Sequence, residues 1–94
     1  MDRIAVRLTI CGRVQGVGYR WWAVREARRL GLDGWVRNRA DGSVELLAAG
    51  SAAAVAELED LCRRGPSSAW VTAIERAGAN GADIPPGFKE RPTV

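Results

Sequence analysis

The chain has 94 residues, of which 47% are hydrophobic and 27% charged, as expected of one small globular domain over residues 1–94. Its 14 basic residues outnumber its 11 acidic ones, and the resulting net charge of +3 favours an anionic ligand. The sequence contains no histidine, which excludes histidine-based catalysis and every metal site that needs an imidazole ligand.

Nothing in the sequence indicates a membrane or secreted protein. The longest uncharged stretch, residues 46–56, is shorter than the about 20 apolar residues that a membrane span needs. The chain opens at Met1 directly into a strand-like pattern, without a signal or transit peptide. We therefore expect a cytoplasmic location. Cys11 and Cys62 are expected to be buried free thiols unless the fold brings them together.

The first third of the chain predicts a strand, a loop and a helix. Hydrophobic residues alternate with other residues over 4–11, which is the period of a half-buried strand. Residues 12–18 contain three glycines and predict a loop. From Tyr19 to Leu30 the apolar residues recur at helical spacing, and Gly31 follows where it would end the helix.

The middle of the chain predicts a hairpin and a second helix. Residues 34–40 and 43–48 are strand-like, and Asp41-Gly42 between them is a typical hairpin turn. Ser51 is placed to cap a helix that continues through Arg64.

The last third predicts a strand over 70–77, a loop over 78–87 and a short edge strand over 88–91. Glu90 takes a position where that edge strand would prefer an apolar residue, which leaves the register of the strand open but does not concern the active site. The order strand, helix, strand, strand, helix, strand predicts an α+β, ferredoxin-like split βαβ sandwich. We expect an antiparallel sheet of four to five strands with two helices on one face.

The glycine-rich loop between the first strand and the first helix has the features of an anion site. Free amides and the positive end of a helix meet there, and Gly16 and Gly18 permit a left-handed backbone that turns successive amides toward one ligand. Arg20 follows in the first helical turn, where its guanidinium can grip the same anion. No Lys-Ser/Thr pair follows the last glycine, which excludes a Walker-type nucleotide loop. On spacing alone, a plain tight turn with a solvated Arg20 is an equal alternative.

Asn38 is a poor strand former near the end of the second predicted strand, and it falls on the same face as Val36. Its carboxamide either caps the approaching Asp41-Gly42 turn or is presented to a ligand. Taken alone, the turn interpretation is favoured.

Together the two stretches resemble the acylphosphatase family. The segment ICGRVQGVGYR at 10–20 is similar to the phosphate-loop signature of that family, and GWVRN at 34–38, followed by DGSV at 41–44 and Gly50, is similar to its second signature. The resemblance implies the ferredoxin-like fold and the metal-free hydrolysis of acyl phosphates to a carboxylate and phosphate, with no cofactor. Tyr19 departs from the more common phenylalanine. Trp21-Trp22 is unusually bulky, and we expect both rings to fill the core rather than shape the pocket rim.

The resemblance also assigns the site residues. By the motif match, Arg20 binds phosphate and Asn38 orients the attacking water. The backbone amides that hold the anion would be those of Gln15, Gly16, Val17, Gly18, Tyr19 and Arg20.

The expected partner is a small acyl phosphate, with phosphate or another anion as an inhibitor. We expect a monomer that binds neither nucleic acid nor a membrane. One alternative is an RNA-binding module that uses Trp35 and Trp70 for stacking and Arg37 and Arg39 for phosphate contacts, but the aromatic motif of such sheets is absent. A regulatory ligand-binding domain is a further alternative, and it would normally be fused to an enzyme.

Overall fold

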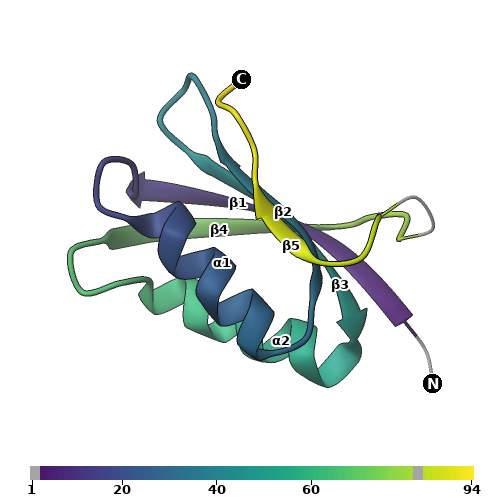
Figure 1. Cartoon of the computed structure of the whole chain (residues 1–94). Helices are drawn as coiled ribbons and strands as arrows, with labels where there is room; N and C mark the ends of the chain where they lie inside the picture. Colours follow the sequence, from purple (N-terminus) through teal and green to yellow (C-terminus); the bar gives the residue numbers. More distant parts are fainter. Residues whose placement is uncertain (1–2, 82–83) are drawn as a thin grey trace.

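Two helices cover one face of a five-stranded sheet in the computed structural model, which describes residues 3–81 and 84–94 (Figure 1). The predicted start at Met1 and residues 82–83 of the predicted loop lie outside the described residues. In chain order the elements are β1 Arg3–Arg13, α1 Tyr19–Arg29, β2 Asp33–Asn38, β3 Val44–Ser51, α2 Ala52–Arg64, β4 Trp70–Gly78 and β5 Phe88–Glu90.

The sheet has the strand order β4-β1-β3-β2-β5, which confirms the predicted ferredoxin-like α+β fold. The pairs β1–β3, β1–β4 and β2–β3 are antiparallel, whereas β5 pairs parallel with β2. The expectation of a wholly antiparallel sheet is therefore wrong at this edge.

The path between β4 and β5 explains the parallel pair. After β4 the chain crosses the face that the helices leave open, where a Cβ atom on Gly81 would lie 3.2 Å from the Cβ of Ala5. It reaches β2 at the first residue of that strand, since the amide of Gly87 donates to Asp33 Oδ1 at 2.8 Å and the amide of Gly34 donates to the Gly87 carbonyl at 3.0 Å. From that end, β5 can only run in the direction of β2.

The core lies between the helices and the inner face of the sheet. Small side chains at Ala23 and Ala27 are fully buried, so α1 lies close against the strands. Tyr19 is also buried, and Trp22 packs edge-on against its ring at a centroid distance of 5.3 Å. Trp21 is instead 64% exposed. The expectation that both rings fill the core is therefore confirmed for Trp22 and wrong for Trp21. The larger buried residues of the core include Leu8, Ile10, Val36, Val44, Leu46, Val55, Leu58, Cys62 and Phe88.

The second strand, predicted over 34–40, is Asp33–Asn38 and ends two residues early. Two other strands are longer than predicted because neighbouring strands extend the ladder. β1 continues to Arg13 through a register shift between Cys11 and Gly12, since β4 supplies partners as far as Trp70. The loop before α1 is therefore shorter than predicted and spans residues 14–18. β3 continues to Ser51, because it is a central strand that pairs with β1 along this whole length.

The two cysteines are free and differ in burial. Cys62 is buried on the inner face of α2, as predicted, whereas Cys11 is only half-buried because its position in β1 faces away from the helices. Within residues 3–81 and 84–94, no helix is long and apolar enough to cross a membrane.

Candidate active site

The loop at 14–18 is held from three sides. Val14 is buried in the core. The Gln15 side chain donates from Nε2 to the carbonyl oxygens of Arg39 at 2.8 Å and Ser43 at 2.9 Å, which ties the loop to the β2–β3 hairpin. The Ser68 hydroxyl donates to the Val17 carbonyl at 2.9 Å. These contacts fix the loop without using any of its backbone amides.

The loop presents unpaired amides at the amino-terminal end of α1. Gly16 and Gly18 have φ of 72° and 80°, a left-handed conformation that costs other residues about 1–2 kcal/mol. Gly18 begins the helix without a side-chain cap, and the first turn carries no acidic residue. In the described part of the chain, no carbonyl oxygen or side chain accepts a hydrogen bond from the amides of residues 15–20. These amides and the helix end form a site for an anion.

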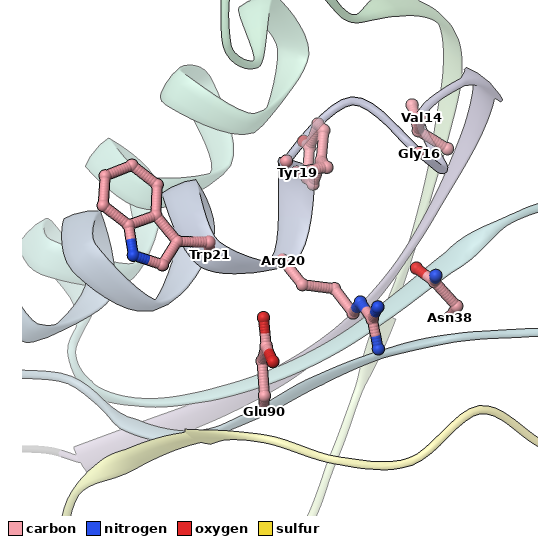
Figure 2. A pocket seen from close by; sticks show the side chains of 8 residues that line it. Val14, Gly16, Tyr19, Arg20, Trp21, Asn38 and Glu90 are labelled. Atoms are coloured by element: carbon pink, nitrogen blue, oxygen red, sulfur yellow. The ribbon is translucent and has the colours of Figure 1, made fainter.

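Arg20 extends from the first turn of α1 toward the end of β2. Figure 2 shows its guanidinium directed toward the carboxamide of Asn38, which lies on the same sheet face as Val36, as predicted. No carboxylate of the described residues forms an ion pair with Arg20 within 4.0 Å. A half-buried guanidinium without a counter-ion is suited to an anionic ligand.

Asn38 is the last residue of β2, and its side chain has a buried acceptor without a donor. Its Oδ1 atom is inaccessible to solvent and has no hydrogen-bond partner among the described residues. The backbone carbonyl of Asn38 accepts from the Val94 amide at 3.2 Å, so the residue itself is firmly placed. A buried unpaired acceptor costs about 1–3 kcal/mol, so a donor that reached Oδ1 would stabilise this arrangement.

These groups line one pocket of about 250 Å³ (Figure 2). The lining residues are Val14, Gly16, Gly18, Tyr19, Arg20, Trp21, Asn38 and Glu90. Of the residues predicted for the site, Gln15 and Val17 do not line the pocket, because their side chains anchor the loop, and only their backbone faces remain available to a ligand.

Sequence reasoning missed three lining residues, Val14, Trp21 and Glu90. The expectation that Glu90 does not concern the active site is wrong. The register pairs Val36 with Glu90, so the glutamate lies on the face that carries Asn38. The signal was present, because Glu90 and Phe88 share one face of a short strand, and a charged residue on an apolar face often lines a cavity.

Two other polar residues near the loop are already engaged. Asp41 accepts from the amide and the hydroxyl of Ser43, at 2.9 and 2.6 Å, and these hydrogen bonds lower the pKa of its carboxyl. It does not line the pocket. Burial raises the pKa of the Tyr19 phenol, whose hydroxyl donates to the Cys62 carbonyl at 2.7 Å. Neither group is available as an acid or base for a ligand.

No cluster of three or more cysteine, aspartate or glutamate side chains suited to a metal ion occurs within residues 3–81 and 84–94. Among the described residues that line the pocket, the positive groups are the Arg20 guanidinium and the loop amides. Together they can bind a tetrahedral anion beside the carboxamide of Asn38, whose buried Oδ1 becomes available as an acceptor when the side chain turns into the pocket.

The sequence profile of the acylphosphatase family matches residues 6–89. The chain belongs to the acylphosphatase family. The acylphosphatase of Nitrobacter hamburgensis is 54% identical to it over an alignment that covers 100% of both chains. Among solved structures, an acylphosphatase from Coxiella burnetii superposes with a TM-score of 0.90 at 31% identity, covering 96% of this chain and 94% of that one. The acylphosphatase from Bacillus subtilis gives 0.89 at 34% identity, covering 94% and 98%.

Membership of the acylphosphatase family makes the chain a hydrolase whose reaction is the hydrolysis of acyl phosphates. The family assignment made from the two signatures is thereby confirmed. The roles of Arg20, Asn38 and the amides of residues 15–20 stay predictions.

Proposed function

We propose that the chain, acting as one domain over residues 1–94 and as a monomer, hydrolyses acyl phosphates by attack of water on phosphorus, with no metal ion or other cofactor. The observation that carries the proposal is the buried, unpaired Oδ1 atom of Asn38 in the same pocket as the Arg20 guanidinium and the free amides of the loop. A turn of the Asn38 carboxamide would bring this acceptor to a water molecule beside the receptor for phosphate.

The loop and Arg20 would hold the phosphoryl group. The amides of residues 15–20 converge on its oxygens at the positive end of α1, and the guanidinium donates two parallel hydrogen bonds. Phosphoryl transfer is promoted mainly by positioning and by stabilising the charge on the equatorial oxygens. Because the loop is already anchored by Gln15 and Ser68, these donors need little rearrangement when the substrate arrives.

Asn38 would orient the nucleophile. With its carboxamide turned into the pocket, its buried Oδ1 would accept a hydrogen bond from one O–H of a water molecule, which turns a lone pair of the water oxygen toward phosphorus. The new bond joins the water oxygen to phosphorus, while the bond from phosphorus to the acyl oxygen breaks and its electron pair leaves with the carboxylate. The proton of the attacking water passes to a phosphate oxygen.

The leaving group removes the need for a general acid. A carboxylic acid has a pKa of about 4–5, so the carboxylate departs without being protonated. This agrees with a site whose nearby phenol and aspartate, Tyr19 and Asp41, are engaged in structural hydrogen bonds. It also agrees with the absence of histidine from the sequence.

Hydrolysis of acetyl phosphate in the presence and absence of EDTA tests the proposal. We expect equal rates, competitive inhibition by inorganic phosphate, and no turnover of a simple alkyl phosphate such as glycerol phosphate. Loss of activity in EDTA that an added divalent metal restores would contradict the metal-free mechanism. Efficient hydrolysis of the alkyl phosphate would require an acid catalyst that the proposal lacks.

The structure leaves one of the two stacking residues of the RNA-binding alternative unavailable. Trp35 is only 9% exposed, and the guanidinium groups of Arg37 and Arg91 lie 4.6 and 5.2 Å from its ring centroid, whereas Trp70 is 72% exposed. A ring covered as that of Trp35 is cannot stack on a base.

A further inference from the structure

Two side chains that belong to neither signature line the same pocket as Arg20 and Asn38. Trp21 comes from the first turn of α1, and Glu90 comes from β5. Figure 2 shows Glu90 and Asn38 on opposite sides of the Arg20 guanidinium, with Trp21 beyond Glu90 on the side away from Asn38. The pocket therefore has two different ends, one at Asn38 and one at Glu90 and Trp21.

The chemistry of the proposed reaction assigns a role to each end. In phosphoryl transfer the attacking and leaving oxygens lie roughly in line on either side of phosphorus. If the water is held at Asn38 and the phosphoryl group by Arg20, the acyl group departs away from Asn38. That direction leads toward Trp21 and Glu90.

The end at Trp21 and Glu90 combines an apolar surface with a negative charge. Trp21 is 64% exposed, its ring points away from Arg20 in Figure 2, and the Arg25 guanidinium lies over it at 4.8 Å from the centroid. Contact with an acyl group therefore requires this exposed side chain to turn toward Glu90. No basic side chain of the described residues forms an ion pair with Glu90 within 4.0 Å. An unneutralised carboxylate in a pocket for an anion weakens binding of any substrate that brings a further negative charge close to it.

We propose that Trp21 and Glu90 form an acyl-group subsite that selects uncharged acyl groups, aromatic ones in particular, and discriminates against acyl groups that carry a carboxylate. This inference rests on the proposed function, because it uses the positions assigned there to the water and the phosphoryl group. Glu90 acts on specificity through its charge, and Trp21 acts through contact with the acyl group.

The charge test compares butyryl phosphate with succinyl phosphate, which has a similar chain length and carries an additional carboxylate. The measured quantity is the kcat/KM for succinyl phosphate divided by that for butyryl phosphate. Glu90→Gln is expected to raise this ratio by about twofold to fivefold, the range for partly exposed charges. Because salt screens the charge of Glu90, the ratios of the variant and of the unchanged chain should become more similar as salt is added. The control Glu75→Gln changes an exposed glutamate of β4 outside the pocket, and it should leave the ratio unchanged.

The aromatic test compares benzoyl phosphate with acetyl phosphate. Trp21→Ala is expected to lower the kcat/KM for benzoyl phosphate relative to acetyl phosphate by about twofold to tenfold, as for the loss of an aromatic pair. Trp70→Ala removes a tryptophan of similar exposure, 72%, outside the pocket and should leave that ratio unchanged.

Each outcome separates the subsite from the proposed function. Acetyl phosphate turnover by the unchanged chain tests the function alone, and its absence would overturn both. With that turnover present, an unchanged succinyl-to-butyryl ratio in Glu90→Gln would overturn the subsite. An equal rise for both substrates would also overturn it, since Glu90 would then act on the phosphoryl end. An unchanged benzoyl-to-acetyl ratio in Trp21→Ala would remove Trp21 from the subsite.

Discussion

The side chain of Gln15 joins the two halves of the site, and its removal should loosen both the fold and the grip on phosphate. Its Nε2 atom donates to two hairpin carbonyls, at 2.8 and 2.9 Å, in a half-buried position. A hydrogen bond of this kind contributes about 0.5–1.5 kcal/mol, so Gln15→Ala should lower the free energy of unfolding by about 1–3 kcal/mol. For a domain of this size, each 1 kcal/mol corresponds to about 4–8 °C in Tm. The backbone amide of residue 15 is unchanged, which separates the side chain from the anion cradle.

Urea unfolding and phosphate inhibition of the same variants provide the measurement. Gln15→Glu should be less stable than Gln15→Ala, because its carboxylate oxygen faces the two carbonyl oxygens where the amide nitrogen stood. If the Gln15 hydrogen bonds hold the loop in its phosphate-binding conformation, each 1 kcal/mol of this free energy that the variant loses should raise the inhibition constant of phosphate by about fivefold. Stability of Gln15→Ala within about 0.5 kcal/mol of the unchanged chain would refute the role of this side chain.

Two further predictions concern Arg20 and Cys62. Arg20→Lys should lower turnover at least about tenfold and abolish competitive inhibition by phosphate, because an ammonium group cannot donate the two parallel hydrogen bonds of a guanidinium. Near-normal turnover in a folded variant would contradict this role of Arg20. Burial raises the pKa of the Cys62 thiol from 9.0 to about 12, so above about pH 9 the unfolded chain releases a proton that the folded chain retains. The free energy of unfolding should therefore decline as pH rises from 8 to 10, and urea titrations should show a shallower decline in Cys62→Val. An equal decline in that variant would assign the effect to other groups.

The sequence predicted the fold because its local signals agree with one another. Ser51 caps α2 with a hydrogen bond from the Ala54 amide at 3.2 Å, and Gly18 begins α1 as the helical spacing indicated. The direction of β5 could not be predicted in the same way. It depends on where the crossing segment meets Asp33, a contact between residues far apart in the chain.

For the site, the sequence identified the residues of the two signatures but not how they are supported. Arg20 and Asn38 lie in one pocket, as the resemblance implied. The side-chain bonds from Gln15 to the hairpin have no local signal, because a glutamine in a loop is equally suited to solvent. Trp21 and Trp22 are adjacent on a helix, and only the placement of α1 on the sheet decides which ring packs inward.

The central claim is that Asn38 positions water while the loop and Arg20 bind phosphate, and Asn38→Ala tests it most directly. Calorimetry of phosphate binding and single-turnover hydrolysis of acetyl phosphate are measured on the same sample, with circular dichroism to confirm folding. We expect phosphate affinity within about threefold of the unchanged chain and a fall in turnover of about two orders of magnitude. Unchanged turnover would make Asn38 a turn residue, and lost phosphate binding would place it in the anion cradle; either result would contradict the account.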